Sequence, residues 1–322
     1  MRTMTRRSIL AAGVAGGTGL ALKGRGAQAQ AAGTPAAVLG GALAGGAWEV
    51  IDLSVTTGEE HPVAFPDQPQ FKVVPLTWFK RRTAVKPGIA AVNAYEITEH
   101  TGTQVDFPPH FIPPPGTNVP GSPGRAIGER SGDEYPLTSL MGPAVVLDVR
   151  AILAAHTAKG RSAKITPAWI ERWEARFGTI ARGEVPVLFS GYTDRYYRRF
   201  PGGDRFKDRL LWKPLIDKSE PGWVVLAPDA VELLWSRGVQ HVATDAPSFG
   251  AAEDPQDSHV AGLKHGMTWT EQAIRLGRLP RRGAFYVCAP YKVADQQAGV
   301  VRAFAFSPRG AAATETEPPL AL

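Results

Sequence analysis

The sequence predicts a single mixed α/β domain, because short strand-like runs alternate with amphipathic helices and no repeat or charge block divides the chain. Eight apolar runs have the length and the β-branched and aromatic content of strands. They lie at residues 48–55, 71–77, 90–99, 144–149, 185–190, 239–244, 285–289 and 300–306. The 322 residues suffice for one large core, and the only cysteine, Cys288, cannot form a disulfide within the chain.

Two helices are expected between these strands. The first begins after Thr166, a capping hydroxyl followed by proline at the first helical position, and ends at Gly178. Its apolar stripe is formed by Trp169, Ile170, Trp173 and Phe177. The second helix begins at Pro228 and ends at Gly238, directly before the strand at 239–244.

Residues 1–29 are typical of a removable export signal. Arg6 and Arg7 precede an apolar stretch rich in alanine and glycine, and Ala27 and Ala29 offer the small side chains that a signal peptidase requires. The paired arginines resemble a twin-arginine signal, which predicts export of the folded protein to the periplasm. An ordinary secretory signal is the alternative. The stretch is too short and too rich in glycine for a stable membrane anchor.

The remaining chain is expected to comprise a flexible segment at 30–47, a folded domain at 48–308 and a disordered tail at 309–322. Five of the 36 basic residues lie in the leader, which leaves 31 basic and 30 acidic residues in the rest of the chain. This near-neutral balance argues against a general nucleic-acid-binding protein.

The segment 100–110 carries the residues most informative about chemistry. It contains two imidazoles, an amide and a carboxylate, on His100, Gln104, Asp106 and His110. A straight strand, at roughly 3.3 Å per residue, would separate His100 from Asp106 by about 20 Å, which is too far for one metal ion to bridge. The strand must therefore bend. Gly102 permits such a bend, and the two prolines before His110 end the strand and turn the chain back.

The amide of Gln104 bears on the identity of the metal. A glutamine carbonyl is a neutral, hard oxygen donor, which suits manganese or magnesium better than zinc.

The segment 100–110 resembles the H-x-G-T-H-x-D-x-P-x-H signature of the cyclase family, which includes bacterial kynurenine formamidases and isatin hydrolases. Gln104 departs from the second histidine of this signature and is similar to the isatin hydrolase version, H-x-G-T-Q-x-D-x-P-x-H, whose members use manganese. The resemblance implies that His100, Gln104 and Asp106 are metal ligands. With Gln104 in place of the histidine, we expect one manganese ion rather than the two zinc ions of the formamidases, with zinc as the alternative. The resemblance also implies that His110 is the general acid and base.

Three further features resemble the family pattern. Residues 244–248 are similar to its T-D-x-P-S strand end, which implies a substrate-side position for Ser248. The spacing of His259 and Glu271 matches the formamidase pair that completes the metal site; alternatively, His259 lies on a surface helix and Glu271 begins the next helix. Phe65 precedes proline, as in the family's aromatic substrate wall, and is either a ring-stacking residue or a hydrophobic loop anchor.

The resemblance implies a swivelling β/β/α domain, assembled as a homodimer, with residues 48–308 as the catalytic domain. The expected reaction is metal-dependent hydrolysis of a small cyclic amide, an isatin-like lactam, or of a lactone. Kynurenine formamidase activity is one alternative, and a catalytically silent periplasmic protein that binds metal or a small carboxylate is another. No Gly-x-Ser-x-Gly nucleophile motif is present in the sequence.

Overall fold

The computed structural model describes residues 35–62, 65–79, 86–87 and 89–321, and the expected export signal at 1–29 lies outside these residues. The chain divides into two units, Met1–Gly45 and Gly46–Leu322. The first unit contains helix α1 (Pro35–Ala44). This helix lies within the segment 30–47, for which flexibility stays a prediction; alanine and leucine favour a helix there in spite of two glycines.

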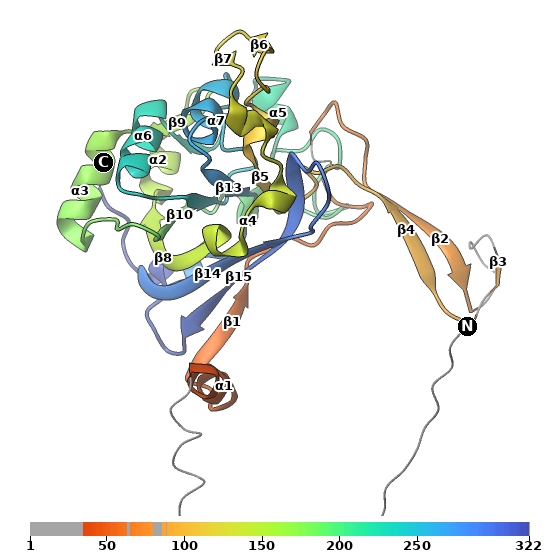
Figure 1. Cartoon of the computed structure of the whole chain (residues 1–322), viewed down its shortest axis with the longest axis horizontal. Helices are drawn as coiled ribbons and strands as arrows, with labels where there is room; N and C mark the ends of the chain where they lie inside the picture. Colours follow the sequence, from red (N-terminus) through yellow and green to blue (C-terminus); the bar gives the residue numbers. More distant parts are fainter. Residues whose placement is uncertain (1–34, 63–64, 80–85, 88, 322) are drawn as a thin grey trace, which may run out of the picture. The chain divides into compact units, whose positions relative to one another are not determined.

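Seven strands of the second unit close into a barrel, with an eighth strand added at one side (Figure 1). Around the barrel they are β5 (Gln104–Asp106), β15 (Ala298–Pro308), β14 (Arg282–Pro290), β8 (Met141–Asp148), β10 (Val185–Phe189), β12 (His241–Thr244) and β13 (Thr268–Glu271), which pairs again with β5. Strands β8, β10, β12 and β13 run parallel to one another, and β1 (Trp48–Asp52) pairs antiparallel with β15. Each of the eight predicted strands overlaps an observed strand, and the α/β class is confirmed.

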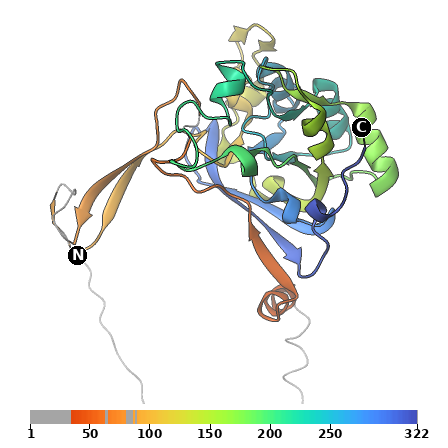
Figure 2. The same ribbon diagram turned by 180° about the vertical axis from the view of Figure 1, so that it is seen from behind.

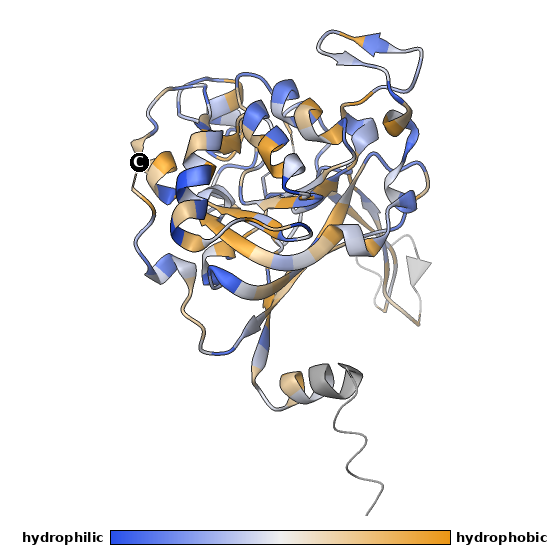
Figure 3. Ribbon diagram, turned by 60° about the vertical axis from the view of Figure 1, so that its left-hand side comes forward, coloured by the Kyte–Doolittle hydropathy of each residue, from blue (hydrophilic) through white to orange (hydrophobic). Residues whose placement is uncertain are grey.

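Side chains of the barrel alternate between its interior and the helices outside it. Ala144 and Val146 of β8 belong to the interior cluster, whereas Val145 and Leu147 pack in the cluster that includes the helices. The surrounding elements are α2 (Arg150–Ala155), α3 (Pro167–Phe177), α6 (Pro228–Ser236), α7 (Gln256–Leu263) and the parallel strand pair β9 (Ala163–Ile165) and β11 (Val224–Leu226). Figure 3 shows the resulting concentration of hydrophobic residues in the barrel strands.

The two predicted helices form as the sequence indicates. The hydroxyl of Thr166 accepts a hydrogen bond from the backbone N–H of Trp169 at 3.4 Å, and α3 ends at Gly178, whose φ is 93°. Helix α6 ends at Ser236, two residues before Gly238. Two shorter helices, α4 (Tyr192–Tyr196) and α5 (Trp212–Leu215), follow β10 along the chain.

A separate sheet is formed by β2 (Lys72–Trp78), β3 (Lys86–Pro87) and β4 (Val92–Glu96). Strands β2 and β4 pair antiparallel, and none of their residues is buried. Large apolar side chains on this pair are exposed, namely Val74, Leu76, Trp78, Val92 and Tyr95. This degree of apolar exposure is uncommon on a strand pair of a monomeric protein.

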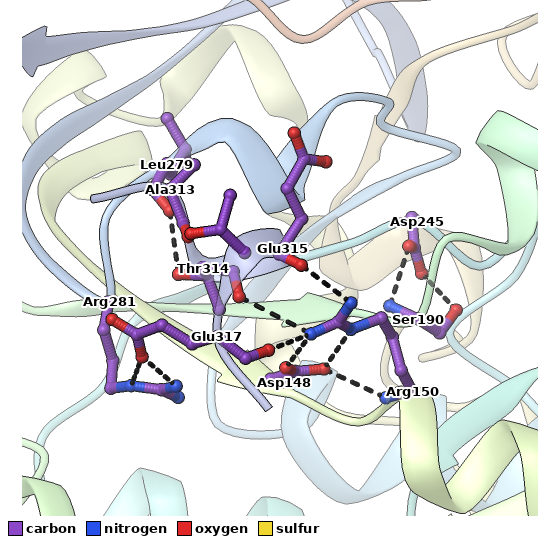
Figure 4. Close-up of polar contacts among 11 residues, drawn as sticks. Asp148, Arg150, Ser190, Asp245, Leu279, Arg281, Ala313, Thr314, Glu315 and Glu317 are labelled. Carbon is purple, nitrogen blue, oxygen red and sulfur yellow. Dashed lines mark hydrogen bonds and ion pairs between the residues drawn. The ribbon is translucent and has the colours of Figure 1, made fainter. Parts of the chain in front are cut away.

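The C-terminal segment is ordered, so the expectation of a disordered tail at 309–322 is wrong for the described residues 309–321. The segment returns toward α3 (Figure 2), and it includes a 3₁₀-helix at Thr314–Thr316. Arg150 donates hydrogen bonds to the carbonyl groups of Thr314, Glu315 and Glu317, and Arg281 pairs with the Glu317 carboxylate at 2.6 Å (Figure 4). Arg150 at the start of α2 and Arg281 directly before β14 thus supply polar contacts to a segment with few apolar residues.

Candidate metal and active site

The segment 100–110 converges on one place because of a bend at Gly102. Gly102 has φ +71°, and an added Cβ there would lie 2.5 Å from Cγ2 of Thr57. His100 consequently lies in the turn before β5, and the 3₁₀-helix Pro108–His110 brings His110 back. The bend that the sequence predicted is present.

Strand β5 directs its polar residues away from the barrel interior. Val105 belongs to the interior cluster, so the alternation of a strand places Gln104 and Asp106 on the outer side. In the register of the barrel, Gln104 lies opposite Glu271 of β13. Helix α7 carries His259 and packs over this side of β13. Its Leu263 belongs to the same hydrophobic cluster as Trp269 of β13.

Two groups of side chains share the Asp106 carboxylate. In the first, Nδ1 of His100 lies 3.5 Å from Oδ1 of Asp106, and Nε2 of His110 lies 3.9 Å from Oδ2. In the second, Nε2 of His259 lies 3.3 Å from Oδ2 of Asp106 and 3.2 Å from Oε1 of Glu271. Within each group, one potential ligand atom per residue lies within 4.8 Å of the others, which is the spacing of a metal site.

The structure places His259 and Glu271 at the site rather than on the surface. Both residues are about 1% exposed, and Glu271 ends strand β13 instead of beginning a helix. Nδ1 of His259 lies 2.6 Å from the Pro255 carbonyl oxygen, to which it donates, so that Nε2 faces the two carboxylates. The Glu271 carboxylate accepts hydrogen bonds from the backbone N–H of Phe249 and from the side-chain amide of Gln104.

Three buried oxygen atoms at the site accept no well-aligned hydrogen bond from the described residues, although Nε2 of His259 approaches one of them at 3.3 Å. They are Oε1 of Gln104 and both carboxylate oxygens of Asp106. Buried polar atoms are nearly always hydrogen-bonded, and an uncompensated buried carboxylate costs several kcal/mol. A cation bound to these oxygens would compensate them, so the donor set fits a metal ion.

Burial and neighbouring charges shift the pKa values of the ionisable side chains at the site. Burial raises the pKa of Asp106, but His110, His259 and His100 outweigh burial and hold this pKa well below its usual range. Burial lowers the pKa of His110 to about 4, despite the opposing charge of Asp106. The Glu271 pKa is raised, first by burial and then by the charge of Asp106. His110 is therefore a neutral imidazole near pH 7.

An apolar cavity of about 380 Å³ contains both residues assigned to the substrate side, Phe65 and Ser248. The Phe65 ring meets the His100 ring edge-on, with centroids 6.1 Å apart, so the cavity adjoins the histidine cluster. The Ser248 hydroxyl accepts a hydrogen bond from the backbone N–H of Gly250 at 3.1 Å. The other lining residues are Pro66, Asp67, Leu215, Ile216, Trp223, Ala251 and Pro255.

Sequence reasoning missed some of these residues. Phe111 stacks on the His259 ring at a centroid distance of 4.3 Å, and its position directly after His110 was a usable signal. No sequence pattern indicated that Leu215, Ile216 and Trp223 line the cavity. They lie in the part of the chain between α4 and β11.

Asp245, which follows Thr244 at the end of β12, links two strands of the barrel. Its carboxylate accepts hydrogen bonds from the hydroxyl and backbone N–H of Ser190 and from the N–H of Gly191, which joins the ends of β12 and β10 (Figure 4). This connection supports the chain that continues to Ser248.

Comparison with known proteins identifies the family. Residues 51–251 match the family model Cyclase, which covers more than half of the chain. The chain belongs to the cyclase family. An isatin hydrolase from Roseibium aggregatum is 26% identical over 278 residues, which cover 84% of this cyclase-family chain and 96% of that protein. A kynurenine formamidase from Salinibacter ruber is 26% identical over 235 residues, or 71% of this chain and 86% of that protein.

Solved structures show the same cyclase-family fold. A crystal structure of an isatin hydrolase bound to the product analogue thioisatinate gives a TM-score of 0.66 at 22% identity, covering 88% of this chain and 100% of that one. Separately, among the described residues no helix combines the length and the apolar character needed to cross a membrane.

Proposed function

We propose that this cyclase-family protein is a metal-dependent hydrolase that opens a small cyclic amide, an isatin-like lactam, or a related lactone. The observation that carries the proposal is the buried cluster around Asp106, with unpaired oxygens that fit a cation, beside an apolar cavity walled by Phe65. The similarity to an isatin hydrolase over 96% of that protein supports the reaction class.

His100, Gln104 and Asp106 would hold the metal, and we propose manganese because two of these three ligands offer hard oxygen donors. Zinc is the alternative. When bound, the ion lowers the pKa of a coordinated water and polarises the scissile carbonyl. His259 and Glu271 lie close enough to Asp106 to complete the ligand set or to hold a second ion.

His110 is the proposed proton carrier. Its imidazole is neutral near pH 7, is about one quarter exposed, and lies next to the His100 ring at a centroid distance of 4.4 Å. It can therefore accept a proton from the attacking water and then deliver that proton to the leaving nitrogen or oxygen. The Phe65 ring would stack against the planar ring of the substrate and orient its carbonyl toward the cluster.

Kynurenine formamidase activity is the second candidate, supported by the similarity to the formamidase from Salinibacter ruber. Gln104 favours lactam opening over formamide hydrolysis, because the formamidase signature has a histidine at this position. A silent metal-binding or carboxylate-binding protein is the third candidate.

A single assay separates these candidates. The purified protein is stripped of metal, reconstituted with manganese or zinc, and followed by absorbance on isatin and on N-formylkynurenine. We expect isatin opening that depends on manganese. Preferential turnover of N-formylkynurenine would support the formamidase, whereas turnover of neither substrate, with metal still bound, would support the binding protein.

We also propose a homodimer that buries the exposed apolar side chains of β2 and β4. Light scattering should give twice the chain mass, and Leu76→Asp should give a monomer. Leu137→Asp makes the same substitution at an exposed leucine outside this strand pair and should leave the dimer intact. A monomeric wild-type protein would refute this assembly.

Export through the twin-arginine signal remains a proposal, and Arg6→Lys with Arg7→Lys should retain the protein in the cytoplasm.

A further inference from the structure

A second cavity, of about 490 Å³, is lined by several cationic side chains and shares no lining residue with the cavity beside Phe65. It lies between α2, α4 and the chain at 209–222. The polar side chains that carry the argument are Arg150, His156, Arg195, Arg209 and Glu220, together with the Tyr196 ring.

Two guanidinium groups flank the same aromatic ring in this cavity. The guanidinium carbon of Arg209 lies 4.5 Å from the centroid of Tyr196, and that of Arg195 lies 5.9 Å from it. Arg209 is held in place, since it donates to the Tyr192 hydroxyl at 2.8 Å and lies 3.4 Å from the Glu220 carboxylate. The Arg195 guanidinium has no hydrogen bond or ion pair with another described residue.

The carboxylates around the cavity are largely committed to other groups. Asp148 forms a two-point pair with Arg150, which also donates to the C-terminal segment, and Asp245 accepts its hydrogen bonds from Ser190 and Gly191 (Figure 4). Glu220, with 44% of its side chain exposed, is the only acidic residue in the lining. Asp148 thus compensates Arg150 and Glu220 compensates Arg209, which leaves Arg195 as the arginine of the lining without a carboxylate partner among the described residues.

We propose that this cavity is a binding site for a small organic carboxylate, separate from the hydrolytic site. Guanidinium groups match carboxylates geometrically, and a bound anion would offset the repulsion between Arg195 and Arg209. The Tyr196 ring and the Leu153 side chain offer an apolar surface for the remainder of such a ligand. This inference does not depend on the hydrolase reaction, because none of these residues belongs to the metal cluster.

Isothermal titration of the metal-loaded full chain with benzoate tests the proposal. We expect saturable binding that is weakened at least about tenfold in Arg195→Gln, the loss typical of one charge-assisted contact. Arg198→Gln removes an exposed arginine of the same segment that does not line the cavity, and it should bind benzoate like the wild type. Benzamide, the neutral analogue, should bind at least about tenfold more weakly than benzoate.

Each alternative outcome is distinguishable. Equal affinities in wild type and Arg195→Gln, or the absence of binding up to about 10 mM benzoate, would overturn the site. Benzamide binding as tightly as benzoate would also overturn it, and inorganic phosphate binding more tightly would refute an organic carboxylate as the ligand class. Benzoate could also bind at the metal cluster; loss of all binding in Asp106→Asn, with retention in Arg195→Gln, would assign it there and contradict the proposal.

Discussion

The side-chain amide nitrogen of Gln104 lies 2.6 Å from Oε2 of Glu271. A carboxylate oxygen accepts a hydrogen bond here, so the glutamine must donate through its nitrogen, and its carbonyl oxygen remains without a donor. Glu271 thus orients Gln104 so that a neutral oxygen is available at a site that already holds the Asp106 carboxylate. Such oxygens suit a hard divalent cation.

This relationship predicts that Gln104→Ala weakens manganese binding by at least about tenfold, because both a ligand and its orienting contact are lost. Competition titration with a metal-sensitive dye measures the affinity. Gln240→Ala, at an exposed position, is the matched control and should bind manganese like the wild type. An unchanged affinity in Gln104→Ala would remove Gln104 from the ligand set.

His110→Gln should lower kcat by about 10² to 10⁴, the usual contribution of a positioned general base, while manganese stays bound. The variant keeps a polar side chain of similar reach beside Asp106. Steady-state kinetics and metal analysis on the same preparation check both parts. If the variant loses its metal instead, His110 is a ligand, as its 3.9 Å approach to Asp106 also allows.

Acid stability should depend on His241, which lies inside the barrel between the hydroxyls of Thr268 and Thr270. Burial lowers the pKa of His241 from 6.5 to about 3. Between pH 6.5 and pH 3, the unfolded chain binds a proton at His241 that the folded protein does not bind. The free energy of unfolding is therefore highest above pH 6.5 and decreases as the pH falls. The slope is about 1.4 kcal/mol per pH unit.

Denaturant unfolding between pH 7 and pH 4 measures this slope. His241→Gln should flatten it, whereas His156→Gln, at a partly exposed histidine outside the barrel interior, should leave it unchanged. The same slope in wild type and His241→Gln would show that other groups govern acid unfolding.

The C-terminal segment should contribute to stability through Thr314. Its buried hydroxyl donates to the Leu279 carbonyl at 2.8 Å, so Thr314→Val should lower the free energy of unfolding by about 1 to 2 kcal/mol. Thr316 lies in the same 3₁₀-helix, but its hydroxyl bonds only the nearby Ala313 carbonyl at an exposed position. Thr316→Val should therefore cost less than about 0.5 kcal/mol, and equal effects would show that the segment is not held at Thr314.

Much of the fold was readable from local patterns. Apolar runs predicted β8 and β10, and a capping hydroxyl with glycine at the far end predicted α3. Strand β5 was predicted only as part of the bent segment 100–110, with no apolar run of its own. The four-residue strand β13 was not predicted, because Thr268 and Thr270 face His241 and Glu271 faces the site, which interrupts the apolar pattern. Closure of the barrel through β5 is a long-range pairing that no local signal encodes.

The candidate site was also predictable from the sequence only in part. The bend at Gly102 and the convergence of His100 with Asp106 followed from spacing and backbone chemistry. The burial of His259 depends on how α7 packs, and its sequence alone fits a surface helix equally well. The apolar wall around Ile216 lies in irregular chain, where no periodicity indicates which side chains face a cavity.

Metal content tests the central claim most directly. The protein is purified without added metal, reconstituted with manganese and zinc in separate samples, and analysed for bound metal per chain alongside isatin hydrolysis. The account predicts one manganese ion per chain, held through Gln104 and Asp106, and activity that rises in proportion to manganese occupancy. Two tightly held zinc ions per chain in the active protein would contradict it.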